Sequence, residues 1–190
     1  MLDMKDIRKD IDAIDLQIRE LLMQRLDCSY KVAQVKQAAG STDIYRAERE
    51  QAILDTLGAD VPTERRAQYL AVVRKITETS RMYQYGLIYD WNQDLFDKIE
   101  GSNLAATPSS LLKVRLTRVN RPNAMSSILS MVGDYGFNME LMELVETSEV
   151  SHTVTFDLTI RGDITQEHMR KLIFQLSKES ANFRILENIA

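Results

Sequence analysis

The sequence of 190 residues contains few of the residues that form metal sites or disulfide frameworks. It has one cysteine, Cys28, and two histidines, His152 and His168. A lone cysteine leaves no disulfide to form within the chain, and two separated histidines do not supply the ligand set of a zinc site. We therefore expect no metal site, and no cofactor-binding motif is present either.

Segments that cross membranes or bind nucleic acid are missing as well. No run of about 18 apolar residues occurs, and the chain opens with a charged amphipathic pattern rather than a signal peptide. The formal net charge is -4 and no basic block stands out. We expect neither a membrane nor nucleic acid as a partner, and a cytoplasmic location. The 44% of hydrophobic residues is typical of a globular chain of one or two domains.

An apolar repeat over residues 6–39 predicts one long helix. Aliphatic side chains recur there every three or four residues, and neither glycine nor proline interrupts the segment before Gly40. A helix of that length extends about 50 Å, whereas a small domain is about 30 Å wide. One compact chain cannot cover such a stripe, so we expect a homodimer with intertwined long helices.

One position of this stripe is occupied by a cation. Counting on from Leu21 places Arg25 on the apolar face, where an unpaired charge would cost several kcal/mol. Lys36 lies on nearly the same face about 16 Å further along the helix. Two interpretations stay open: both cations hold one small anion, or Arg25 extends to solvent or pairs with Asp15 or Glu20.

Two further helices are predicted in the first hundred residues. Residues 46–57 form a short helix that ends at Gly58, and its inner face includes Arg49 and Glu50. The stripe of the third helix is apolar at both ends and polar in the middle, and it consists of Leu70, Val73, Thr77, Ser80, Gln84 and Leu87. Its polar middle would face Arg25 if the helices pack side by side.

The period of the pattern changes in the second half of the chain. The helical pattern continues to Ile99, and the small and polar residues 101–110 are typical of a linker. The pattern beyond predicts strands and helices in the order βαββαβ, at residues 112–117, 125–132, 138–147, 152–161, 169–176 and 183–186. We predict an α+β chain: an all-α helical domain at 1–100 and a ferredoxin-like sandwich at 111–190.

Five short segments of the helical part occur in an order that a known enzyme family shares. They are Arg8 with Ile11–Asp15, Leu21–Arg25, Val32–Lys36, Tyr45–Glu50 and Ser80–Gln84. Together they cover residues 1 to about 90 and resemble the all-helical (type II) chorismate mutases. The resemblance implies an intertwined helical homodimer that rearranges chorismate to prephenate in phenylalanine and tyrosine biosynthesis, an isomerase without a cofactor.

The resemblance also implies a role for each candidate residue. Lys36 and Gln84 would donate to the ether oxygen of chorismate, while Arg8 and Arg25, helped by Ser80, would bind its two carboxylates. The reaction is intramolecular and needs no nucleophile. Catalysis must therefore come from holding a dianion in its reactive conformation and from donors placed where negative charge develops.

The remaining candidates adjoin a departure from the family pattern. Arg49 would support the anionic pocket and Glu50 would accept from the ring hydroxyl. Some members have an aspartate three residues before Arg49, where this chain has Arg46, so Glu50 would make the hydroxyl contact alone. Arg8 lies about 42 Å from Lys36 along a continuous helix. It would therefore complete the site of the partner subunit or belong to no site.

The second domain resembles the ACT family, small βαββαβ modules that bind amino acids between paired copies. Its first strand-to-helix turn has Asn123 where such modules usually have glycine, and asparagine tolerates left-handed backbone angles. The candidate effector-binding residues are Asn120, Pro122, Asn123 and Ala124. A regulatory amino-acid effector and a purely dimerising role both stay open.

Two other functions remain compatible with the sequence. Isochorismate pyruvate lyases, which form salicylate, share the helical architecture and a similar cationic pocket. A non-enzymatic amino-acid sensor with a mutase-like body is the other alternative, although a decayed site should have lost at least one of Lys36, Arg49 and Gln84.

Overall fold

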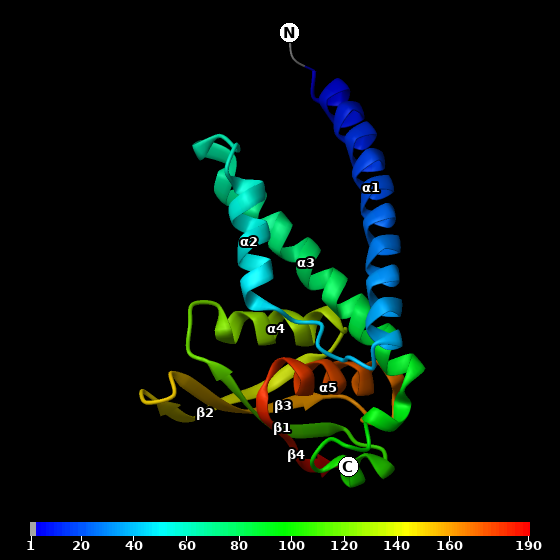
Figure 1. The fold of residues 1–190 in the computed structure, drawn as a ribbon, viewed down its shortest axis with the longest axis vertical. Helices are drawn as coiled ribbons and strands as arrows, with labels where there is room; N and C mark the ends of the chain where they lie inside the picture. Colours follow the sequence, from blue (N-terminus) through cyan, green and yellow to red (C-terminus); the bar gives the residue numbers. More distant parts are fainter. Residues whose placement is uncertain (1–2) are drawn as a thin grey trace. The chain divides into compact units, whose positions relative to one another are not determined.

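The computed structural model describes residues 3–190, and it confirms the α+β fold class (Figure 1). Its elements are α1 (Met4–Ala38), α2 (Ala47–Gly58), α3 (Thr63–Trp91), the 3-10 helices η1 (Gln93–Leu95) and η2 (Ser102–Ala106), β1 (Leu111–Val119), α4 (Ala124–Asp134), β2 (Asn138–Ser148), β3 (Thr153–Arg161), α5 (Glu167–Glu179) and β4 (Ala181–Ile189). The chain forms two compact units, one up to Leu87 and one from Ile88 onward. Among the described helices, none is both long and apolar enough to span a membrane.

Helix α1 is continuous, as predicted (Figure 1). The side chain of Asp3 caps its first turn by accepting from the backbone N–H of Lys5 at 2.9 Å. The only buried residues of this helix are Ser29 and Ala33. Leu21, in the middle of the apolar stripe, is 64% exposed. Within a single chain the stripe is therefore largely open.

Helices α2 and α3 contribute further buried residues to the first unit. Leu54 and Val73 are buried, and so are the polar Thr77 and Ser80 in the middle of α3. The hydroxyls of these two residues donate to backbone carbonyls of the preceding turn, at 2.7 Å and 2.9 Å. Each hydroxyl proton is therefore donated within α3. The hydroxyl oxygens keep lone pairs that can accept a hydrogen bond from a side chain of another helix.

The predicted continuation of the third helix to Ile99 is wrong, because α3 ends at Trp91. Asn92 leaves the helical region with a φ of -145° and a ψ of 59°. Its side-chain amide donates to the carbonyl oxygen of Ile88 at 2.8 Å, the acceptor that its own backbone N–H would use in a continuing helix. The asparagine side chain thus replaces the next backbone hydrogen bond.

The second unit is a four-stranded antiparallel sheet in the order β2-β3-β1-β4. The predicted βαββαβ order is confirmed, and α4 and α5 lie on one face of the sheet (Figure 1). Alternate residues of β1 and β3 fill the core, with Leu112, Val114, Leu116, Leu158 and Ile160 all at 0% exposure. The alternation of apolar and polar residues in the sequence therefore predicted the buried face of these strands correctly.

The segment predicted as a linker contains a short helix that packs on β4. Ala105 in η2 is 2% exposed, and the Asn188 side chain donates to the carbonyl oxygens of Leu104 and Thr107 at 2.8 Å and 2.9 Å. Just before it, Gly101 has a φ of +82°, and a Cβ there would lie 2.3 Å from the carbonyl oxygen of Ile185. The close approach of two backbones requires glycine at this position.

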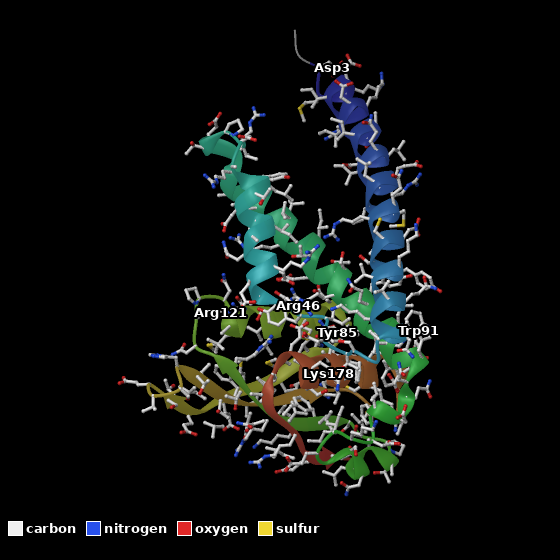
Figure 2. All side chains as sticks on the ribbon, in the orientation of Figure 1. Asp3, Arg46, Tyr85, Trp91, Arg121 and Lys178 are labelled. Carbon is white, nitrogen blue, oxygen red and sulfur yellow. The ribbon has the colours of Figure 1, made fainter. Side chains whose placement is uncertain are left out.

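We predict that Gly101→Ala destabilises the second unit by roughly 2–4 kcal/mol, because it combines overpacking with left-handed strain. Gly133→Ala is the matched control, since a Cβ on this helical glycine meets nothing within 4 Å. It should stabilise by about 0.5–1 kcal/mol. Urea unfolding followed by the fluorescence of the single tryptophan, Trp91, measures both (Figure 2). Equal unfolding midpoints for the two variants would contradict the close contact.

Candidate functional site

The guanidinium of Arg25 joins α1 to the polar middle of α3. Its Nη1 donates to the hydroxyl oxygen of Ser80 and to the carbonyl oxygen of Ile76, the latter at 3.3 Å. Ser80 is buried and Arg25 is half-buried. The expected meeting of Arg25 with the third helix is therefore found, whereas the alternative pairing with Asp15 or Glu20 is not. Burial lowers the pKa of Arg25 from its usual value.

Lys36 lies in a group of cations near the end of α1. Its ammonium donates to the backbone carbonyl of Asp43, in the segment that connects α1 to α2. Burial lowers the pKa of Lys36; the Asp43 carboxylate raises it, and the positive charges of Arg46 and Arg49 lower it again. The structure thus brings Lys36 close to Arg49, as the candidate site requires, and an anion bound here would relieve the repulsion among the cations.

Glu50 is held by a cation that sequence reasoning left without a role. The Nη1 of Arg81 donates to Oε1 of Glu50, and Arg81 is only 9% exposed. The signal for Arg81 was present in the sequence. It lies four residues after Thr77 and four before Tyr85, and all three side chains are buried on one face of α3.

The two remaining candidates lie differently. Gln84 is half-buried, one turn of α3 beyond Ser80. Arg8 is exposed near the start of α1, which continues unbroken to Lys36 and beyond. The structure thus brings Arg25 to Ser80 and Lys36 close to Arg49. It does not bring Arg8 to them within one chain.

The arrangement suits an anion better than a metal ion. Arg25, Lys36 and Arg49 contribute positive charge, and the carboxylate of Glu50 is neutralised by Arg81. Among residues 3–190, no group of histidine, cysteine, aspartate and glutamate is placed to hold a metal ion. These side chains can bind carboxylates and donate hydrogen bonds to a developing negative charge.

A pocket of about 550 Å³ opens in the second unit, beside the turn between β1 and α4. It is lined by Asn120, Arg121, Asn123, Ala124, Met125, Ser126, Met142, Leu144, Thr147, Val154 and Phe156. Three of the four predicted effector-binding residues belong to this lining, and Pro122 does not. Asn123 has a φ of 70°, which confirms that asparagine adopts the left-handed conformation at this turn.

Comparison with protein families identifies the first unit. Residues 7–85 match the model of the family described as chorismate mutase type II. This part of the chain is therefore a type II chorismate mutase domain, as its resemblance predicted. The resemblance of the second unit to the ACT family stays a prediction. The match covers fewer than half of the residues, and it ends before the βαββαβ unit begins. No match was found among curated proteins.

We predict opposite pKa changes of Lys36 in two variants. Arg46→Gln removes a nearby cation and should raise the pKa, whereas Asp43→Asn removes the nearby carboxylate and should lower it. The NMR titration of isotopically labelled lysine side chains measures both, with Lys36→Arg assigning the signal. Shifts of the same sign in the two variants would contradict the placement of Lys36 between these charges.

Proposed function

We propose that the chain is a chorismate mutase that rearranges chorismate to prephenate. The observation that carries the proposal is the contact of Arg25 with Ser80, which joins α1 to α3 inside the segment that matches the family. Lys36 on α1 and Arg49 on α2 add two further cations that lie close to each other. A chorismate dianion requires a site of this charge.

Catalysis at this site follows from position and charge. Arg25 binds one carboxylate, with its guanidinium oriented by Ser80 and the carbonyl of Ile76. Lys36 and Gln84 donate to the ether oxygen, where negative charge develops as the carbon–oxygen bond breaks. Arg49 adds positive charge, and Glu50 accepts from the ring hydroxyl. The rearrangement is intramolecular and needs neither proton transfer nor a cofactor, so the site has to hold the substrate close to its reactive geometry.

The complete site belongs to a homodimer in this proposal. The open stripe of α1 supports it, since Ile14 and Leu21 are 53% and 64% exposed in one chain. A second copy of α1 would cover these side chains, and burying each would contribute roughly 1.5–3 kcal/mol. The same pairing would bring Arg8 of one chain to the second carboxylate in the site of the other.

The test is an assay of the purified chain with chorismate and isochorismate separately. Formation of prephenate from chorismate supports the proposal. Formation of salicylate and pyruvate from isochorismate would show a lyase instead. Absence of both products would indicate the amino-acid sensor.

We predict that Lys36→Ala lowers turnover by two to three orders of magnitude while the fold is retained. Losing one donor to a developing charge typically costs roughly 3–4 kcal/mol in the transition state. Lys31→Ala, an exposed lysine of the same helix, is the control and should retain activity. Prephenate formation and circular dichroism of both variants measure the effect. Near-normal turnover of folded Lys36→Ala would remove this lysine from the mechanism.

A shared site also predicts recovery in mixed dimers. Arg8→Ala and Lys36→Ala should each be nearly inactive, but coexpression should restore about a quarter of wild-type activity. With random pairing, half of the dimers are mixed, and each has one intact site of two under two-fold symmetry. Lys36→Ala coexpressed with Gln84→Ala is the control. Both residues belong to the same chain's half of the site, so no recovery is expected. Mixed dimers of the first pair without recovery would exclude Arg8 from the partner's site.

We further propose that an aromatic amino acid regulates the enzyme through the second unit. The pocket beside the β1–α4 turn supports this, because its volume of about 550 Å³ is that of a small-molecule site. Met142, Val154 and Phe156 provide an apolar lining for a side chain. The backbone N–H groups at the start of α4 are suited to an α-carboxylate.

We predict that phenylalanine or tyrosine binds this pocket and changes mutase activity. Ser126→Trp should block binding, because Ser126 is exposed and lines the pocket. Ser151→Trp, an exposed serine outside the lining, should leave binding unchanged. Calorimetry with each amino acid measures the effect. No heat and no thermal shift with any aromatic amino acid would leave the second unit without this role.

A further inference from the structure

Arg81 is a buried cation for which the proposed reaction has no direct use. It lies on α3 between Ser80 and Gln84 and is 9% exposed. A buried guanidinium is costly unless its charge is paired and its donors are bonded. Its Nη1 donates to Oε1 of Glu50 on α2, and this ion pair joins the two helices.

Aromatic packing fixes the guanidinium from its other side. Its central carbon lies 4.7 Å from the centre of the Tyr45 ring, a cation–π distance. The backbone N–H of Tyr45 donates in turn to the hydroxyl oxygen of Tyr85 at 3.2 Å, and Tyr85 is only 1% exposed (Figure 2). Arg81 thus contacts the half-buried ring of Tyr45, whose backbone is held by the buried Tyr85, as well as the carboxylate of Glu50.

The neighbouring arginine does not share this position. Arg46 pairs with Asp43 at 3.6 Å, and both side chains are more than 60% exposed. The cation that meets Glu50 is therefore Arg81 from α3. Without Arg81, the Glu50 carboxylate could rotate toward Arg49 and Lys36 and pair with them. A bound dianion would need these same two cations.

We propose that Arg81 is a positioning residue that fixes the carboxylate of Glu50 for the ring hydroxyl of the substrate. By holding one carboxylate oxygen, Arg81 leaves the other to accept a hydrogen bond from the substrate hydroxyl, and it keeps Glu50 from neutralising the substrate-binding cations. The inference rests on the proposed function, because it assigns the hydroxyl contact to Glu50. Arg81 on α3 would thus position Glu50 in a chain that has Arg46 where some members of the family have an aspartate.

The test is a double-mutant cycle on chorismate turnover, with Arg81→Met, Glu50→Gln and the double variant. Arg81→Met should lower kcat/KM at least tenfold, and the double variant should be no worse than Glu50→Gln, because Arg81 acts only through Glu50. Arg81→Lys keeps the charge without the planar fork and should recover part of the loss. Arg74→Met, an exposed arginine of the same helix, is the control and should be unchanged.

A chorismate analogue that lacks the ring hydroxyl separates positioning from a general structural role. Arg81→Met should lower turnover of this analogue less than it lowers turnover of chorismate, because the analogue has no hydroxyl contact to lose. An equal loss on both substrates, or losses that multiply in the double variant, would overturn the proposal. If Arg81→Met does not fold, the same comparison with Arg81→Lys decides. No turnover of chorismate by the wild-type chain would instead overturn the proposed function and this inference with it.

Discussion

The partial burial of one guanidinium is the constraint on which the first unit depends. Arg25 occupies the stripe of α1 that would otherwise be apolar, and it must find acceptors there. The hydroxyl of Ser80 and the carbonyl of Ile76 supply them, so the contact fixes how α1 meets α3. Both acceptors are neutral. The positive charge is therefore oriented but not cancelled, and it remains available to an anion.

The charged residues of the candidate site form two groups: neighbouring cations, and a carboxylate that is paired with another cation. Lys36, Arg46 and Arg49 repel one another, and burial together with this repulsion lowers the pKa of Lys36. Binding an anion among them would raise that pKa, which by linkage means that a protonated Lys36 favours binding. The nearby carboxylate of Glu50 would weaken this attraction if it paired with the same cations. Its pairing with Arg81 holds it apart from them.

The second unit is stabilised by a separate core. Its central strands have buried aliphatic residues on one face and polar residues on the other. On the polar face, Arg115 donates two hydrogen bonds to the Asp157 carboxylate, at 2.5 Å and 2.8 Å. Hydrogen bonds from Arg115 lower the pKa of Asp157. The left-handed Asn123 turns the chain from β1 into α4, and the pocket opens beside this turn. The left-handed residue of that turn thus lines the pocket.

The sequence by itself determined the features that arise from local periodicity: the long helix, Arg25 in its stripe and the βαββαβ order. It also contained the five segments of the mutase domain. Only the structure showed that α3 ends at Trp91, that residues 102–106 form a helix on β4 and that Arg81 pairs with Glu50. Periodicity reports which face of an element is buried. The partner of a buried charge lies far away in the chain, so only the packing of the helices selects it.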